Sequence, residues 1–288
     1  HHQLAFASLE ITTDRVVFVY EHVGIGNEVL CALKPALQLP GLRASLESEE
    51  ARAAPRAAAL AQVLLALGMA VLSYMWMGFC TPVVVVRRSA ASAAAVAVGM
   101  STAVGSSAGA LSPSQLAFWR DVFLKGLREH FLVNGIRSFD GKGGLQDFKL
   151  MCEGEDFPGA ETPKLHKAAD NFPAGCDSVR RRPRVLVPMG AGKDSSVAWE
   201  LLARCRVSGN ASEAACECRW FFCEGSSREF ERCWRYQALA AASKSSASSE
   251  DVLVAEFVFP TAEFERARNQ ALALSGHPWA CLVCFAAT

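Results

Sequence analysis

The sequence predicts an α/β protein in which a smaller α+β domain precedes a parallel sheet covered by helices on both faces. Short apolar runs typical of buried strands alternate with amphipathic helical patterns from residue 184 onward. A loop containing two glycines joins the first of these strands to the first of these helices. Alternation at this spacing implies right-handed crossovers and parallel strands. The chain before residue 141 carries a different pattern of strand and long helix.

The composition is that of a folded protein with a sizeable core. The chain has 288 residues, 51% of them hydrophobic and 20% charged, which is enough for one large or two ordinary domains. We expect an N-terminal domain over 1–140, a linker over 141–183 and an ATP-binding domain over 184–288. The formal net charge is zero, so no global field favours nucleic acid or an acidic membrane. The basic run at 180–184 is interpreted as a solvated linker, with an anion-binding rim as the alternative.

The eleven cysteines are scattered, with no regular spacing and no secretory signal, which favours reduced thiols in a cytoplasmic protein. Two pairs have short spacings that leave zinc as an alternative. Cys216 and Cys218 are too close together for a usual zinc knuckle, and Cys281 and Cys284 lie in an apolar run. We expect no metal bound by cysteine.

In the N-terminal domain, β-branched and aromatic residues from Arg15 predict a strand. A helical pattern begins at Glu47, and residues 57–86 contain no charged side chain over thirty positions. That length alone is typical of a membrane span. Four residues interrupt the run: Gln62, Ser73, Thr81 and Pro82. We therefore predict a buried helix followed by a core strand at 83–86, and no membrane contact.

A low-complexity tract of Ala, Ser, Gly and Val at 89–110 is interpreted as a flexible insertion. The next segment predicts a helix with a serine cap at Ser112, a first-turn proline and a capping-box partner at Gln115. Its apolar residues recur at helical spacing, and Asn134 with Gly135 predicts its end. We assign its aromatic stripe to the core.

The ATP-binding domain is predicted as strand, helix, strand, helix, strand, helix. The strands are expected at 184–189, 219–225 and 252–259, and the helices at 195–205, 227–243 and 263–274. In the first helix, Val197, Leu201 and Cys205 lie on one face.

The loop after the first strand, within PMGAGKDSSVAWELL at 188–202, has the residues of a phosphate cradle but neither familiar nucleotide motif. A P-loop requires glycine at the position of Val187 and serine or threonine at that of Asp194. A dinucleotide fingerprint requires glycine at the position of Ser195. Yet a loop that follows a strand and opens a helix presents backbone N–H groups to an anion. Both named motifs are excluded, and phosphate binding is not.

The side chains of this loop favour a polyphosphate bound with a metal ion. Gly190, Ala191 and Gly192 let an anion approach the backbone, Lys193 adds a charge, and two serines, Ser195 and Ser196, add hydroxyl donors. Asp194 repels phosphate unless a divalent cation bridges the two, so it implies Mg²⁺. The alternative is an ordinary turn in which Asp194 caps the helix.

The GAGKDS loop resembles the SGGxDS loop of the PP-loop ATP pyrophosphatases, which have the adenine nucleotide alpha hydrolase-like fold. Gly190 stands where that superfamily usually has serine, and Ala191 where it has glycine. The resemblance implies cleavage of ATP between its α- and β-phosphates and transfer of AMP to a substrate oxygen.

Four segments are similar, in the same order, to the UDP-N-acetylmuramoyl-L-alanyl-L-glutamate epimerases. They are LSYMWMGFCTPVVVV at 72–86, the helix at 111–136, the loop at 187–202 and NQALALSGHPWA at 269–280. In the last segment, Ser275 replaces the family's asparagine before Gly-His. Because the family continues beyond the point matching Thr288, we expect the ATP-binding domain to be incomplete here.

This resemblance implies an isomerase of peptidoglycan precursor synthesis that epimerises the terminal L-glutamate of a UDP-linked muramoyl dipeptide through an acyl adenylate. Lys193, Asp194 and His277 are the implied catalytic residues, with Asp194 on the metal and ATP and Mg²⁺ as cofactors. His277 is equally interpreted as a capping or core histidine, and Glu224 is expected at the functional edge of the sheet. The alternatives are an amide ligase, a tRNA-modifying enzyme or a non-catalytic nucleotide-binding fragment. No nucleic-acid partner is expected, and the sequence does not indicate an oligomeric state.

Overall fold

The protein is a mixed α/β structure with a mixed sheet and helices. The computed structural model describes residues 2–39, 41–52, 54–100, 111–137, 147–153, 184–188, 197, 201, 217–224 and 252–258. Chain contacts divide the molecule into two compact units: His1–Pro158 with Phe257–Ala286 and Thr288, and Gly159–Glu256 with Ala287. The N-terminal unit holds most of the described side chains.

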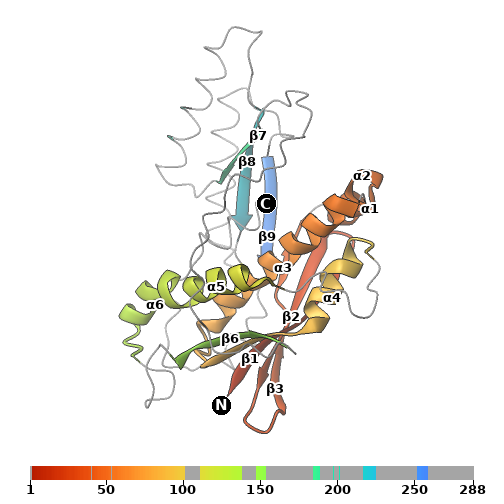
Figure 1. Cartoon of the computed structure of the whole chain (residues 1–288). Helices are drawn as coiled ribbons and strands as arrows, with labels where there is room; N and C mark the ends of the chain where they lie inside the picture. The colour runs from red at the N-terminus through yellow and green to blue at the C-terminus, as the bar shows by residue number, and fades with distance from the viewer. Residues whose placement is uncertain are drawn as a thin grey trace. The chain divides into compact units, whose positions relative to one another are not determined.

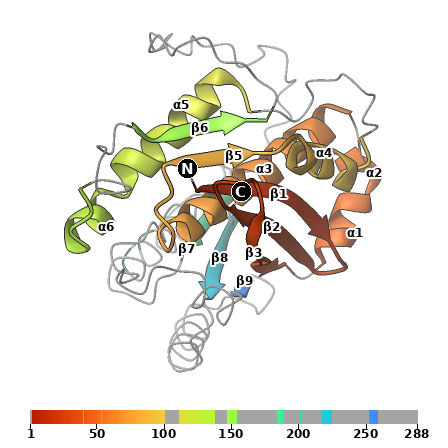
Figure 2. The ribbon, with the colours of Figure 1, turned by 90° about the horizontal axis from the view of Figure 1, so that it is seen from below.

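The N-terminal unit is built on the strands β1 to β6, in the order β6-β5-β1-β2-β4, with β3 also paired to β2 (Figures 1 and 2). Their bounds are β1 (Gln3–Ile11), β2 (Arg15–Val23), β3 (Val29–Leu33), β4 (Ala36–Gln38), β5 (Val83–Val86) and β6 (Lys149–Cys152). β1 and β2 are antiparallel, whereas β5 is parallel to β1 and β6 is parallel to β5. The strand expected from Arg15 is therefore confirmed as β2.

β1 and β2 form a long hairpin, in which burial alternates along the first part of β2, whereas Leu4 to Ala7 of β1 are buried on both faces of the strand. The Thr12 amide donates to the Arg15 carbonyl at 2.9 Å and closes the turn. The pairing register shifts between Phe6 and Ser8, which is a β-bulge. Such a bulge increases the local twist of the strand pair.

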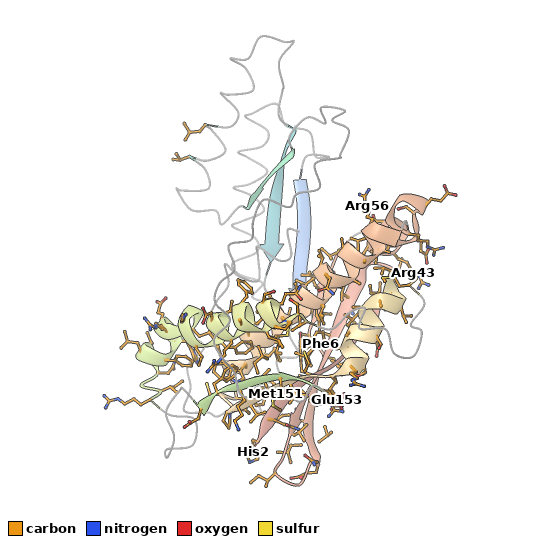
Figure 3. The ribbon with its side chains drawn as sticks, in the orientation of Figure 1. His2, Phe6, Arg43, Arg56, Met151 and Glu153 are labelled. Atoms are coloured by element: carbon orange, nitrogen blue, oxygen red, sulfur yellow. The ribbon has the colours of Figure 1, made fainter. Side chains whose placement is uncertain are left out.

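The apolar run of the sequence forms α3 (Ala54–Trp76), which packs on the sheet, and β5 follows it as predicted. α3 crosses the sheet in Figures 1 and 2, and the hydroxyl of Tyr20 on β2 donates to the Gly68 carbonyl at 2.7 Å. Phe6, which Figure 3 labels, lies 5.2 Å from Tyr20 between ring centroids. A Cβ at Gly68 would clash with the Phe6 ring, so glycine permits this close approach.

α3 is also the one helix of the described residues that is long and apolar enough to cross a membrane. An 18-residue window within Arg56–Trp76 has a mean hydropathy of 1.9, and 61% of that window is buried inside the protein. The core helix of a soluble protein meets the same criterion. The burial of Leu65, Met69 and Leu72 at 0% exposure is that of a helix in a protein core.

Trp76, the last residue of α3, joins the turn before β5 to the helical segments that follow in the chain. The Trp76 indole donates to the Thr81 carbonyl at 2.9 Å, and its ring packs edge-on against Phe123 and Phe131. The aromatic stripe of the sequence therefore lies in the core, as expected. Cys80 in this turn has a φ of 47°, a left-handed conformation that is uncommon for a residue other than glycine.

The expected flexible insertion at 89–110 is wrong at its start. Arg88–Ala97 form α4, whose Ala90, Ala91, Ala94 and Ala95 are buried. Alanine has the highest helix propensity, and its small side chain permits close packing on α3 and β1. Low complexity therefore marks a closely packed helix at this place. Residues 101–110 lie outside the described residues.

The helix expected over 112–134 is formed in three pieces: α5 (Pro113–Asp121), the π-helix η1 (Val122–Gly126) and α6 (Arg128–Val133). The predicted capping box is confirmed, with the Gln115 amide donating to the Ser112 hydroxyl and the Ser112 amide to the Gln115 side chain. Gly135 has a φ of 64° and ends the helix as expected. The π-helix was not predicted.

Two shorter helices and one strand complete the N-terminal unit. α1 (Leu42–Glu47) and α2 (Glu49–Arg52) precede α3. β6 lies within the range that the sequence analysis interpreted as a linker, and it pairs with β5 from Val83 opposite Lys149 to Val86 opposite Cys152. Its four residues, Lys149–Cys152, include no β-branched or aromatic side chain, so they carry no strand signal of their own.

The second described sheet segment consists of β7 (Arg184–Pro188), β8 (Glu217–Glu224) and β9 (Val252–Val258). β8 is parallel to both of its neighbours. The three strands were predicted from their apolar runs, and their parallel arrangement is confirmed.

Candidate functional site

The candidate site begins at the carboxyl edge of β7, β8 and β9. Pro188, the last residue of β7, pairs with Phe221, so β8 extends three residues beyond it to Glu224. In open α/β sheets ligands bind at the carboxyl ends of the strands. The segment from Met189 to Ser196 follows β7 directly and so begins at this edge.

The residues predicted to bind ATP and to carry the chemistry lie outside the described residues. They are Gly190, Ala191, Gly192, Lys193, Asp194, Ser195, Ser196 and His277. Their roles stay predictions. Val197 and Leu201, on the helix expected after the loop, are in helical conformation and are 57% and 58% exposed. The face that these two residues share is therefore exposed, although its apolar pattern predicts burial.

Two acidic residues occupy neighbouring positions at the edge of this sheet. Glu224 ends β8, where the sequence analysis expected it, and it pairs in register with Glu256 of β9. The sequence pattern around Glu256 does not mark it as a site residue. Its pairing follows from the register of two strands separated by 27 residues, which no local pattern reveals.

A second cluster of reactive side chain types lies buried in the N-terminal unit. The Cys80 Sγ is 3.9 Å from Nε2 of His130, and Nδ1 of that histidine is 3.2 Å from Nδ2 of Asn134. Cys80 and His130 are only 7% and 0% exposed. Cysteine, histidine and asparagine in this order are the residue types of some nucleophilic sites.

The donors and acceptors in this cluster are not arranged as in a site where histidine activates a cysteine. The Asn134 Nδ2 also donates to the His130 carbonyl at 2.8 Å, which fixes the orientation of the amide. With Nδ2 as the donor and Nδ1 as the acceptor, a neutral His130 ring has its proton on Nε2, which faces the sulfur. The Cys80 thiol in turn donates to the Met77 carbonyl at 3.5 Å. A general base would instead need a free lone pair on Nε2.

Burial also keeps this thiol protonated. Desolvation raises the pKa of Cys80 from its ordinary value of 9.0 to about 12. Reactive cysteines have lowered pKa values and are partly exposed. The cluster therefore joins the α3–β5 turn to α6 and does not act as a nucleophile. The sequence analysis missed it because Cys80 and His130 are 50 residues apart.

The part of the chain that the structure describes contains no group of three or more His, Cys, Asp or Glu side chains arranged to hold a metal ion. Cys31, Cys80 and Cys152 in that part of the chain are not joined by a disulfide. The cysteine pairs at 216–218 and 281–284 are not covered by this finding except for Cys218, a backbone position of β8.

Comparison with known proteins identifies no relative: no family model, no curated protein and no solved structure matches the chain. A functional proposal therefore depends on the residues of the loop at 190–196 and on β7, the strand directly before it.

Proposed function

We propose that the chain is a PP-loop enzyme that transfers AMP from ATP to a carboxylate and epimerises the terminal L-glutamate of UDP-N-acetylmuramoyl-L-alanyl-L-glutamate. The observation that carries the proposal is the position of GAGKDS directly after β7, a strand parallel to β8. A phosphate-binding loop at the carboxyl end of a parallel strand is the usual arrangement in nucleotide-binding α/β proteins.

The donor set of the loop fits a magnesium nucleotide by residue type. Small residues at 190–192 expose backbone N–H groups, and Lys193 with Ser195 and Ser196 supplies further donors to phosphate oxygens. Asp194 supplies the carboxylate oxygen that Mg²⁺ prefers. Bound Mg²⁺ neutralises charge on the polyphosphate and orients it.

The chemistry explains why an epimerase would use ATP. The α-hydrogen of glutamate is only weakly acidic while the neighbouring carboxylate is charged. Formation of a carboxyl–AMP bond, with departure of pyrophosphate, removes that charge and acidifies the α-hydrogen. A base then removes the α-proton, an acid returns one to the opposite face, and water releases AMP. Lys193 would stabilise charge on the transferring phosphates, and His277 is the proposed proton carrier.

The test is to incubate the full chain with ATP, Mg²⁺ and the UDP-linked dipeptide and to separate the nucleotide products. The proposal predicts AMP and pyrophosphate, formed only when the dipeptide is present. ADP as the product would contradict every PP-loop assignment, whereas AMP formed with tRNA would favour a modification enzyme. ATP binding without turnover would identify a non-catalytic nucleotide-binding protein.

The Asp194→Asn variant links the activity to the loop. Its matched control is Glu129→Gln, which removes one carboxylate charge from the exposed first turn of α6. The proposal predicts that Asp194→Asn abolishes magnesium-dependent AMP formation with an unchanged circular dichroism spectrum, and that the control retains activity.

A further inference from the structure

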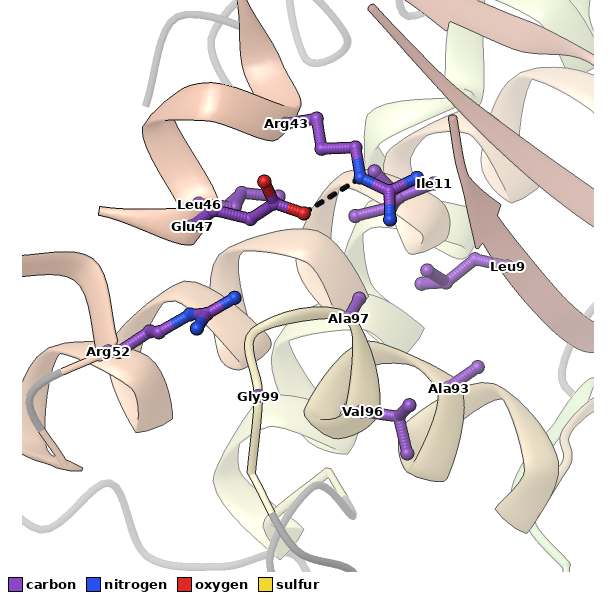
Figure 4. A pocket seen from close by; sticks show the side chains of 10 residues that line it. All are labelled: Leu9, Ile11, Arg43, Leu46, Glu47, Arg52, Ala93, Val96, Ala97 and Gly99. Atoms are coloured by element: carbon purple, nitrogen blue, oxygen red, sulfur yellow. Dashed lines mark hydrogen bonds and ion pairs between the residues drawn. The ribbon is translucent and has the colours of Figure 1, made fainter. Parts of the chain in front are cut away.

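The N-terminal unit contains a hollow whose lining residues are all distinct from those of the proposed nucleotide loop. It has a volume of about 380 Å³ and lies between the end of β1, α1, α2 and the C-terminal half of α4 (Figure 4). Pockets that bind small molecules have volumes of roughly 300–1,000 Å³. The hollow is therefore large enough for a small organic ligand.

Apolar side chains form part of the lining of this hollow. Leu9 and Leu46 are 4% and 6% exposed, and Ile11 and the small side chains of Ala93 and Ala97 complete the apolar lining. Figure 4 shows these side chains facing the same space from β1, α1 and α4. A ligand body of matching size would lose its contact with water against them.

Two arginines reach into the hollow from α1 and α2 (Figure 4). The Nε of Arg43 donates to Oε1 of Glu47 at 2.8 Å, which fixes the guanidinium and leaves its two terminal nitrogens for another acceptor. Arg52 has neither a hydrogen bond nor an ion pair to any other described residue through its side chain. Its stem passes the C-terminus of α4, where Gly99 has no Cβ.

The charges around the hollow leave an excess of positive charge. Its lining includes Arg43, Arg52 and one carboxylate, Glu47. The pKa of Glu47 lies below its ordinary value because of the hydrogen bond from Arg43 first, and then because of the charges of Arg43 and Arg52. Both cations therefore act on the same space, and the partial negative charge at the α4 C-terminus offsets only part of one of them.

We propose that this hollow binds a small organic carboxylate, with the carboxylate on Arg43 and Arg52 and the apolar body against the half-buried side chains of Ile11, Ala93 and Ala97. A carboxylate fits better than a neutral ligand because two guanidinium groups line the hollow with a single counter-ion, Glu47. A planar carboxylate also matches the fork of N–H donors on a guanidinium.

The probe is 3-phenylpropanoate, titrated into the full chain and followed by ligand-observed NMR. Its neutral amide, 3-phenylpropanamide, tests the need for charge, and inorganic phosphate tests for a general anion site. The proposal predicts saturable binding of the carboxylate and at least tenfold weaker binding of the amide and of phosphate. Absent carboxylate binding, or equal binding of the amide or phosphate, would overturn it.

Three variants locate the site. Arg52→Gln is expected to weaken binding about tenfold or more, because it removes a charge-assisted hydrogen bond. Ala93→Leu leaves every charge in place but fills the hollow from α4, and it is expected to abolish binding. The matched control Arg128→Gln removes an exposed arginine of α6 and is expected to leave the dissociation constant within twofold.

Unchanged binding in Arg52→Gln or Ala93→Leu would overturn the location, because both side chains line the hollow. Circular dichroism of each variant shows whether it is folded. Asp194→Asn is expected to leave carboxylate binding unchanged, so failure of the nucleotide assignment and failure of this site give different results.

Discussion

Substitution of Gly68 by alanine tests the packing of α3 on the sheet. A Cβ at this position would overlap the Phe6 ring and lie 3.3 Å from Cδ1 of Phe18. Phe6 and Phe18 are 0% exposed, so neither ring has free space to move into. Overpacking of this kind costs up to about 3 kcal/mol, and the better helix propensity of alanine recovers about 1 kcal/mol. The expected net destabilisation is about 2 kcal/mol.

The assay is urea unfolding of the full chain, with hydrogen exchange of α3 amides identifying the transition that contains this helix. The matched control is Gly126→Ala at the exposed end of η1, where the nearest atom, Cγ1 of Val122, would lie 3.8 Å from the new Cβ. This control is expected to leave stability unchanged or to raise it by up to about 1 kcal/mol.

A second-site substitution separates the clash from other causes. Phe6→Leu shortens the side chain that the new methyl group would meet, so Gly68→Ala should cost less in the Phe6→Leu background than in the wild type. A Gly68→Ala protein as stable as the wild type, with unchanged protection of α3, would refute the account of this interface.

The remaining predictions concern protonation and the loop. The Cys80 thiol loses its proton near pH 9.0 in the unfolded chain and near pH 12 in the folded protein. The free energy of unfolding should therefore fall above pH 9, by up to about 1.4 kcal/mol per pH unit from this thiol. An equally steep fall in Cys80→Ala would contradict this. Burial first, and the charge of His2 second, lower the pKa of His22 below 6.5, so the unfolded state binds the proton more readily. Stability should therefore decline as the pH falls below 6.5, and denaturant titrations should show a smaller decline in His22→Gln. For the loop, Lys193→Ala should reduce the rate of AMP formation at least a hundredfold, measured at saturating ATP; an unchanged rate would remove Lys193 from the chemistry.

Local patterns predicted the longer elements well. The apolar run ending at Trp76, the four valines of β5 and the capping box at Ser112 each carry their signal within a few residues, and each forms as expected. The strands β7, β8 and β9 were predicted for the same reason. Periodicity and capping report on backbone conformation directly, so a single sequence is enough to find them.

Elements defined by distant contacts were missed. β6 is a strand because Lys149 to Cys152 align with β5, not because of its own residues. The alanine tract around Ala94 becomes a helix through its packing on α3 and β1. The Cys80–His130 contact and the arginine hollow likewise bring together segments that are far apart in the chain.

For the candidate site, the sequence contributes more than the structure does. The types and spacing of residues 190–196 predict a phosphate-binding loop, because glycines, a lysine and an acid are the residues that such a loop uses. The structure adds the strand β7 directly before this segment, its parallel pairing with β8, and the pairing of Glu224 with Glu256. The positions of the loop's side chains stay predictions.

The most direct test of the proposed reaction is exchange of the glutamate α-hydrogen in D₂O. The full chain is incubated with the UDP-linked dipeptide and Mg²⁺, with and without ATP, and the recovered glutamate is analysed by mass spectrometry and chiral chromatography. The account predicts D-glutamate carrying one deuterium at the α-carbon, formed only with ATP and accompanied by AMP. Recovery of undeuterated L-glutamate alone, while ATP is consumed or left intact, would contradict it.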